Sequence, residues 1–348
     1  MPPAEELVTL TDDGLYCPAG GFHIDPWNPV ARAVVTHAHA DHARWGCGTY
    51  LAADPGEHLL RTRLGETADI RTIPHGRPGG TKPGRRCDPP AGHVLGSAQV
   101  RLERWGEVWV VTGDYKLDPD PTCLPFEYVR CHTFITESTF GLPIYRWDRP
   151  DELFADVNGW WRANKDGGKC SNLYAYALGK AQRVMAGVDA TIGPILTHGA
   201  VEKVTRAYRE SGVTLPPTTP VGEVAVSRGK AKPWPGSLVI APPSAAGSVW
   251  ARKFEPASEA VASGWMRVRG ARRRKAVDRG FALSDHADWP GLLTAVRESG
   301  ATRVLATHGF APVLARHLRE RGLDAGVIAT RYGDEEEWAD PPAAEGIP

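Results

Sequence analysis

Short runs of apolar and β-branched residues recur along the chain, and several of them end at a side chain that is able to bind a metal ion. These runs and the polar residues that follow them are residues 33–36 before His37, 107–112 before Asp114, 133–136 before Glu137, and 304–307 before His308. Short continuous apolar runs predict buried β-strands. Because strand ends are rigid and the loops after them are free to vary, an active site is expected where these strands end.

The pattern changes between residues 150 and 274, where helical periodicity alternates with short apolar runs. Helices are predicted over residues 151–164, 179–187 and 201–211, and strands over residues 173–177 and 238–241. This alternation predicts a small α/β unit with a parallel sheet. Trp160 and Trp161 lie within the first of these helices, and we expect them in its core rather than on a base-stacking surface.

The earlier pattern returns after residue 277, which predicts one catalytic domain interrupted by an inserted α/β domain. The expected boundaries are residues 1–148 and 276–348 for the first domain and residues 149–275 for the insert. A length of 348 residues fits this layout. The 38 glycines and 30 prolines favour a loop-rich α/β chain over a helical bundle.

Composition places the chain among globular proteins without a membrane segment. Hydrophobic residues make up 42% and charged residues 24%, which is ordinary for a protein that buries a core. No stretch approaches the roughly 20 apolar residues that cross a bilayer. The first residues carry neither the basic segment nor the apolar run of a signal peptide. Six scattered cysteines without a C-x-x-C pair then favour reduced thiols, so we expect a cytoplasmic location.

The densest chemical signal is His37-Ala-His39-Ala-Asp41-His42, with three imidazoles and a carboxylate directly after a predicted strand. A spacing of two places His37 and His39 on one side of an extended segment, and the following turn aims Asp41 and His42 at a second point. Borderline divalent metals prefer such ligands, and two adjacent metal positions suit phosphoryl chemistry. A chance histidine cluster on a surface loop is the alternative.

Three further residues extend this pattern in the order of a known superfamily. They are Asp25 ahead of the motif, His93 in Gly-His-Val-Leu-Gly-Ser, and Asp114 in Thr-Gly-Asp-Tyr. Together with the His-x-His-x-Asp-His motif, they resemble the metallo-β-lactamase superfamily. The resemblance implies an αββα sandwich in which Asp25 steadies the histidine loop, His93 is the third histidine ligand and Asp114 bridges two metals.

Four further segments resemble the β-CASP nucleases within that superfamily. They are Glu137-Ser-Thr-Phe-Gly, Leu283-Ser-Asp-His-Ala-Asp, Thr307-His-Gly, and Tyr176-Ala-Leu-Gly-Lys-Ala-Gln in the predicted insert. The resemblance covers nearly the whole chain and implies that the insert is a β-CASP α/β domain. The short insert and the run from Asp114 to Thr122 resemble the bacterial DNA-ligase-associated exonucleases in particular.

The resemblance also implies two zinc ions, with manganese as the alternative metal, and a general acid. The first ion would be held by His37, His39, His93 and Asp114, and the second by Asp41, His42, His308 and again Asp114. The catalytic residues would be Asp114, Glu137 and His286. His286 would protonate the leaving 3′-oxygen while Glu137 orients its ring.

These assignments imply a metal-dependent phosphodiesterase that acts on nucleic acid. The most similar subgroup implies a DNA exonuclease that works 5′ to 3′ on single strands in DNA repair, with an ATP-dependent DNA ligase and a helicase as partners. His308 stands where eukaryotic DNA-acting members usually carry valine, which leaves an RNA-processing endo- or exonuclease as the alternative. We expect DNA rather than RNA, and no membrane partner.

Two hypotheses from other classes stay open. One is a small-molecule metallohydrolase such as a thioesterase or lactonase, and the other is a non-catalytic scaffold. The pair of Glu137 and His286 argues against the first, because a carboxylic leaving group needs no such acid. The full set of expected ligands argues against the second.

The charge balance bears on a nucleic-acid partner. The 41 Lys and Arg residues offset 41 Asp and Glu residues, and a neutral chain is unusual for a protein that binds phosphates along a strand. The cations are unevenly placed, because one run (Arg267–Lys275) precedes His286 and another (Arg77–Arg86) precedes His93. We interpret them as a phosphate track, with a solvated surface as the alternative. The candidate phosphate contacts are Arg272, Arg273 and Arg274.

Five other residues have weaker context. Ser97, Ser138 and Ser284 stand beside the ligand motifs and are candidate donors to a terminal phosphate. His198 lies in a second Thr-His-Gly sequence, for which we predict a loop histidine, with substrate contact as the alternative. His23 is predicted to be a packed or hydrogen-bonded histidine.

Overall fold

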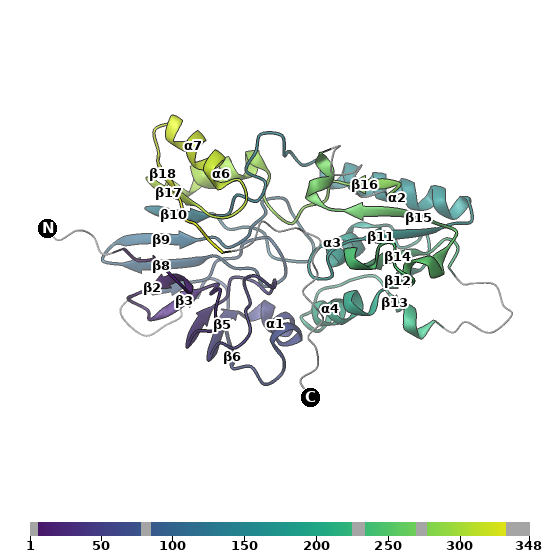
Figure 1. Ribbon diagram of the computed structural model, residues 1–348, viewed down its shortest axis with the longest axis horizontal. Coiled ribbons are helices and arrows are strands. Elements are labelled where there is room, and N and C mark those ends of the chain that lie inside the picture. Colours follow the sequence, from purple (N-terminus) through teal and green to yellow (C-terminus); the bar gives the residue numbers. More distant parts are fainter. Residues whose placement is uncertain (1–5, 78–84, 225–233, 269–276, 332–348) are drawn as a thin grey trace. The chain divides into compact units, whose positions relative to one another are not determined.

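The computed structural model describes residues 6–77, 85–224, 234–268 and 277–331 (Figure 1). Within these residues the chain forms two compact units. The first falls within Met1–Arg146 and His286–Glu335, and the second within Trp147–Asp285. The chain therefore leaves the first unit and later returns to it.

The return to the first unit lies later in the sequence than predicted. The sequence pattern placed it at residue 276, but β16 (Arg279–Phe281) pairs in parallel with β15 (Ala257–Ala262). β16 is therefore part of the sheet of the second unit, and the crossing falls between Asp285 and His286. A local apolar pattern does not reveal which sheet a short strand joins.

The first sheet of the first unit follows the order of the chain. Its strands are β1 (Thr9–Thr11), β2 (Gly14–Cys17), β3 (Phe22–Ile24), β4 (Arg32–Val34), β5 (Thr49–Ala53) and β6 (Ile70–Ile73). β1 to β3 pair antiparallel, and β3 to β6 pair parallel. The parallel crossover from β5 to β6 runs through α1 (Glu57–Leu64), which packs against β6.

The second sheet has the order β18-β17-β10-β9-β8-β7. Its strands are β7 (Arg85–Cys87), β8 (Val100–Arg104), β9 (Glu107–Val111), β10 (Thr133–Thr136), β17 (Arg303–Ala306) and β18 (Asp324–Val327). The strands predicted over 107–112, 133–136 and 304–307 are confirmed to within one residue. β9, β10 and β17 are parallel neighbours, so the residues that follow them meet at one edge of the sheet.

The core of the first unit lies on both faces of the second sheet. Val108 and Val110 of β9 pack among side chains of α6 (Trp289–Ser299) and α7 (Ala311–Glu320), whereas Trp109 and Val111 pack among side chains of the first sheet. Successive side chains of a strand point to opposite faces. Burial of both faces explains why this strand is apolar along its length.

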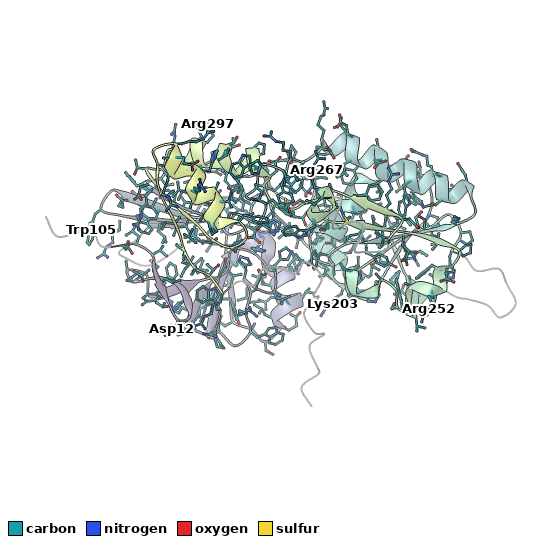
Figure 2. The ribbon with its side chains drawn as sticks, turned by 45° about the horizontal axis from the view of Figure 1, so that its top comes forward. Asp12, Trp105, Lys203, Arg252, Arg267 and Arg297 are labelled. Atoms are coloured by element: carbon teal, nitrogen blue, oxygen red, sulfur yellow. The ribbon has the colours of Figure 1, made fainter. Side chains whose placement is uncertain are left out.

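The hairpin between β8 and β9 ends in an exposed tryptophan (Figure 2). The Trp105 side chain is 77% exposed, and the Arg104 guanidinium lies 3.7 Å from the centre of its ring. The indole is thus covered on one face by a cation–π contact and is otherwise largely open to solvent.

The second unit is built on one parallel sheet with the order β13-β12-β14-β11-β15-β16. Its other elements are β11 (Cys170–Tyr174), β12 (Ile195–Thr197), β13 (Thr219–Pro220), β14 (Leu238–Ala241), α2 (Pro150–Asp166), α3 (Lys180–Gly187) and α4 (Gly199–Glu210). Side chains of the three helices pack on one face of this sheet. The predicted α/β unit with a parallel sheet is confirmed.

Trp160 and Trp161 lie in this core, as predicted. Their side chains are 9% and 0% exposed, and their indole nitrogens donate to Ser258 Oγ at 3.1 Å and to the Gly236 carbonyl at 3.0 Å. A buried indole N–H needs such a partner. Neither ring is available for stacking on a base.

Both units combine helices with sheets, so the chain has a mixed α/β fold. Among the described residues, no helix has the length and apolar character that crossing a bilayer requires.

Candidate metal centre

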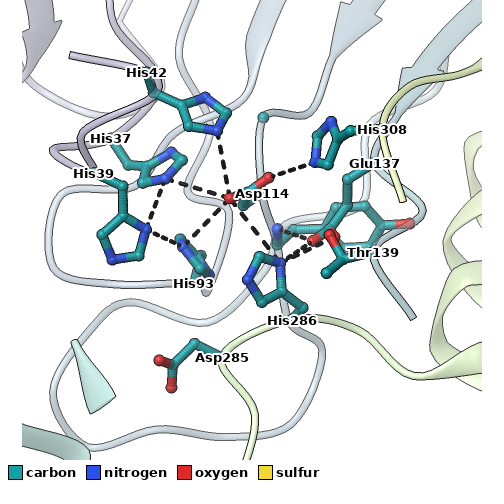
Figure 3. A network of polar contacts seen from close by, with 12 residues as sticks. His37, His39, His42, His93, Asp114, Glu137, Thr139, Asp285, His286 and His308 are labelled. Carbon is teal, nitrogen blue, oxygen red and sulfur yellow. Dashed lines mark hydrogen bonds and ion pairs between the residues drawn. The ribbon is translucent and has the colours of Figure 1, made fainter. Parts of the chain in front are cut away.

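Four predicted ligands from three separate segments converge at the edge of the first unit's sheets (Figure 3). Nδ1 of His39 lies 3.0 Å from Nε2 of His37 and 3.0 Å from Nε2 of His93. Oδ2 of Asp114 lies 3.4 Å from Nε2 of His37 and 3.7 Å from Nε2 of His93. One donor atom of each residue therefore faces a common point.

This donor set fits a zinc-type ion. Ligand atoms 2.0–2.1 Å from a tetrahedral centre lie about 3.4 Å from one another, and imidazole nitrogens and carboxylate oxygens are the donors that zinc accepts. The four separations of 3.0–3.7 Å agree with that spacing. His37, His93 and Asp114 are buried, so an ion bound here would be shielded from water on most sides.

A second set of donors shares Asp114 with the first. Nε2 of His42 lies 3.4 Å from Oδ2 of Asp41 and 3.5 Å from Oδ2 of Asp114. Nε2 of His308 lies 3.1 Å from Oδ1 of Asp114. The structure therefore brings the other six predicted ligands together around the carboxylate of Asp114, in two sets that share it. Two neighbouring metal positions of this kind suit phosphoryl chemistry.

Asp25 and Thr36 orient the histidine loop. Oδ1 of Asp25 accepts the Thr36 N–H at 2.7 Å, and Oδ2 accepts the Thr36 hydroxyl at 2.6 Å. Oδ2 also lies 2.8 Å from Nδ1 of His42. Because a carboxylate only accepts, Nδ1 of His42 donates, and Nε2 is left to face Asp41 and Asp114. The sequence predicted the supporting role of Asp25 but missed Thr36, although it directly precedes His37.

The electrostatics of the centre are those of a tight anion–cation cluster. Burial lowers the pKa of His37, and the neighbouring His42 and His93 lower it further. Burial also opposes the charge on His42, but the carboxylates of Asp41, Asp114 and Asp25 outweigh it and raise the His42 pKa well above its usual range.

The same balance acts on the shared carboxylate. Burial opposes ionisation of Asp114, yet the positive charges of His42 and His286 hold its pKa well below the usual value. The carboxylates of the cluster are therefore ionised and lie next to positive charge. A bound divalent cation would stabilise the ionised carboxylates in the same way.

A carboxylate–imidazole pair stands beside the two ligand sets. Nδ1 of His286 lies 3.1 Å and 3.0 Å from the two carboxylate oxygens of Glu137, and 4.0 Å from Oδ2 of Asp114. Glu137 also accepts the Tyr115 N–H at 2.8 Å and the Thr139 hydroxyl at 2.6 Å. Glu137 also lies near enough to Asp114 and His308 to be a possible ligand. Both of its oxygens contact Nδ1 of His286, as an orienting role would require.

Two of the three candidate serines hold ligand loops in place. The Ser97 hydroxyl accepts the N–H of His93 at 3.0 Å and of Val94 at 3.3 Å. The Ser138 hydroxyl donates to the carbonyls of Thr307 and His308. Both serines are buried, so their hydroxyls position the loops of His93 and His308 in this structure. Their contact with a terminal phosphate stays a prediction.

Of the remaining candidates, the structure describes Ser284 alone. The Ser284 carbonyl accepts a hydrogen bond from Arg183 Nη1 within the second unit. Arg272, Arg273 and Arg274 lie outside the described residues.

The two other candidate histidines, His198 and His23, have structural partners. His198 is the N-cap of α4, where its Nδ1 accepts the Ala200 N–H at 3.1 Å. A Thr-His-Gly sequence therefore marks a strand end followed by a helix in both units. His23 packs 4.7 Å from the Tyr16 ring centre and lies 3.3 Å from the Thr11 hydroxyl, as expected of a packed histidine.

Gly113 allows Asp114 to reach the centre. Its φ is +56°, and a Cβ there would lie 2.5 Å from Oγ1 and 2.6 Å from Cβ of Thr36. We expect Gly113→Ala to lower the free energy of unfolding by about 1–3 kcal/mol and to weaken metal binding at least about tenfold, because Thr36 and Asp114 must move. Denaturant unfolding and metal titration measure the two effects.

Gly106→Ala is the matched control. Gly106 has φ +83°, and a Cβ added there would have no neighbouring atom within 4 Å, so alanine meets the same backbone penalty without a clash. Equal metal affinity in the two variants would show that Gly113 has no special role in placing Asp114.

No protein-family model matches the chain. A protein of Opitutus terrae named "Probable DNA ligase" is 34% identical over 322 residues, which cover 90% of this chain and 30% of that protein. Cleavage and polyadenylation specificity factor 73 of Drosophila melanogaster is 29% identical over 48% of this chain and 27% of its own length. Endoribonuclease ysh1 of Aspergillus fumigatus is 32% identical over 44% of this chain and 17% of its own length. The chain thus spans less than a third of the length of these curated relatives.

A solved structure shares the fold. The crystal structure of a protein of unknown function from Enterococcus faecalis V583 matches with a TM-score of 0.60 at 11% identity, over 86% of this chain and 79% of that one. The coverage indicates that both units contribute to the likeness.

Proposed function

We propose that this chain is a two-metal phosphodiesterase that cleaves nucleic acid, with a metallo-β-lactamase sandwich and an inserted β-CASP domain. The observation that carries the proposal is the position of Asp114, whose carboxylate lies between the two ligand sets. Its Oδ2 is 3.4–3.7 Å from Nε2 of His37, His93 and His42, and its Oδ1 is 3.1 Å from Nε2 of His308. Such sharing suits an in-line displacement, in which the attacking and the leaving oxygen each need a neighbouring positive charge. The matches to a probable DNA ligase and to two RNA-processing proteins support a nucleic-acid substrate.

Two sets of side chains would hold the two metal ions. The residues that would hold one ion are His37, His39, His93 and Asp114, and those that would hold the other are Asp41, His42, His308 and Asp114. Bound zinc, or manganese in its place, supplies an activated water at neutral pH and stabilises negative charge on the phosphate.

His286 is proposed as the general acid. Its Nδ1 donates to Glu137, so its Nε2 is the nitrogen that carries the proton for the leaving 3′-oxygen. The Tyr115 N–H and the Thr139 hydroxyl hold Glu137 in place, and the carboxylate stabilises the positive imidazole. A thioester or lactone would need no such acid, which argues against a small-molecule hydrolase.

Within this class we propose a single-strand DNA exonuclease that works 5′ to 3′ in repair in the cytoplasm, with an ATP-dependent DNA ligase and a helicase as partners. The relative that covers 90% of the chain bears the name of a DNA ligase, which favours DNA. RNA processing is the second candidate, because His308 contacts Asp114 and the other two relatives bear RNA-processing names.

The test is digestion of end-labelled single strands of DNA and RNA of one sequence, each with a 5′-phosphate or a 5′-hydroxyl. The proposal expects stepwise shortening of the 5′-phosphorylated DNA that a chelator stops and added zinc or manganese restores. His198→Asn, which keeps a capping side chain outside the centre, is the control variant and should cleave like the unmodified protein. Equal activity with chelator, or cleavage of neither strand, would refute the proposed nuclease.

A further inference from the structure

The loop that follows ligand His42 presents a cation and an indole to solvent. Arg44 is exposed, and the Trp45 side chain is 50% exposed. Both stand within three residues of the metal centre in the sequence and belong to the first unit. Neither residue takes part in the ligand sets or in the general-acid pair.

Hydrogen bonds from a buried tyrosine hold this loop in one shape. The Tyr50 hydroxyl donates to the Arg44 carbonyl at 2.6 Å and accepts the Cys47 N–H at 3.0 Å. Gly46 has φ +88°, and a Cβ there would lie 3.2 Å from Cγ of Pro29. The loop therefore presents Trp45 in a fixed position, and a ligand that binds it would lose little conformational entropy to the protein.

A second guanidinium approaches the loop from α1. Nε of Arg63 donates to the carbonyl of Ala43 at 3.3 Å, between His42 and Arg44. Burial lowers the pKa of Arg63, Asp41 opposes this shift and Arg44 adds to it, so Arg63 lies within electrostatic range of both side chains. Within the part of the chain that the structure describes, its two Nη groups form no hydrogen bond or ion pair.

We infer that Arg44, Trp45 and Arg63 form a nucleotide-binding site beside the metal centre, on the side of ligand Asp41. The two guanidinium groups would bind phosphate oxygens of the strand, and the indole would stack on a base. Every base has a π face, so the site recognises single-stranded nucleic acid without reading its sequence. The inference rests on the proposed nuclease function and names how the strand is held.

The three residues complement one another chemically. Asp41 partly offsets the two guanidinium groups in the free protein, but an ion held by Asp41 would cancel that negative charge and leave a net positive site. A phosphate next to the scissile one would then meet two planar donors. A chain with no net charge would thus bind a strand through local positive charge, without a basic surface overall.

The experiment measures equilibrium binding of the metal-loaded full chain to a fluorescent, 5′-phosphorylated, phosphorothioate-linked DNA strand that resists cleavage. Trp45→Ala should weaken binding about 5- to 150-fold, which is the usual loss for one stacked base. Arg63→Gln should weaken binding and reduce the slope of log affinity against log salt by about 0.7, the contribution of one phosphate contact on a single strand.

The chain offers a matched control for each variant. Trp105→Ala removes an indole that is 77% exposed on the hairpin between β8 and β9. Arg61→Gln removes a guanidinium of the same helix as Arg63, where it pairs with Glu57 at 2.8 Å. Both controls should bind the strand like the unmodified chain.

The failure of this inference differs from the failure of the proposed function. If the unmodified chain cleaves single strands while Trp45→Ala and Arg63→Gln bind like their controls, the nucleotide-binding site is refuted and the nuclease stands. If the unmodified chain neither binds nor cleaves the strands, the proposed function fails, and the site fails with it.

Discussion

Replacing Asp114 by alanine is expected to abolish hydrolysis and to remove at least one bound metal ion. Its carboxylate lies 3.1–3.7 Å from ring nitrogens of His37, His93, His42 and His308. A bound metal contributes several kcal/mol to the transition state, and each 1.4 kcal/mol lost lowers the rate tenfold. We therefore expect kcat to fall at least about 10³-fold, measured beside the metal content of the purified protein by elemental analysis.

Asp118→Ala is the control for this variant, because it removes a partly exposed carboxylate of the same segment that belongs to neither ligand set. It should keep both metals and full activity. Retention of two metals by Asp114→Ala would overturn the shared-ligand assignment, whatever happened to the rate. Asp114→Asn gives a second measurement, since the amide keeps the shape of the side chain and loses its charge.

Replacing His286 by alanine is expected to lower kcat about 10²- to 10⁴-fold while both metals stay bound. The residue contacts Glu137 and lies 4.0 Å from Asp114, but the two ligand sets are complete without it. The loss should shrink with an activated p-nitrophenyl phosphodiester, because an acidic leaving group departs without a proton. A merely structural role would lower the rates of both substrates equally.

Glu137→Gln tests the pair as a unit. In our proposal Glu137 acts through His286. Once His286 is absent, removing the Glu137 carboxylate should therefore lower kcat little further. The double variant His286→Ala with Glu137→Gln should therefore be about as slow as His286→Ala alone. Rate losses that multiply would show that Glu137 has a separate function, such as ligation together with Asp114 and His308.

The sequence by itself was sufficient to predict most of the strands and helices and the types of side chain that form the metal centre. The apolar run at 107–112 predicts β9 because burial on both faces demands apolar residues at every position, and this requirement is visible locally. The histidine motif is likewise local, since its four donors lie within six residues. Trp160 and Trp161 follow the same rule, because helical periodicity already separates core from surface.

Tertiary structure decided which partners those residues meet. In the sequence, Ser97 and Ser138 are candidate donors to a phosphate. Only the fold shows that their hydroxyls also bond to backbone groups of the ligand loops. β16 reads as the start of the returning domain until its pairing with β15 places it in the second unit. A hydrogen bond or a strand pair depends on groups that only folding brings within about 3 Å, so no local pattern specifies it.

The site of Arg44, Trp45 and Arg63 also combines a local sequence feature with a contact that only the fold creates. The sequence places Trp45 three residues after His42, yet it does not reveal that Arg63, eighteen positions further on, shares its surroundings. The α1 crossover between β5 and β6 brings that guanidinium to the Ala43 carbonyl. Local patterning thus determined the types of ligand and the strands that carry them, because periodicity reports burial. Only the packed fold determined orientation, hydrogen-bond partners and shared charge, because these depend on distances between remote parts of the chain.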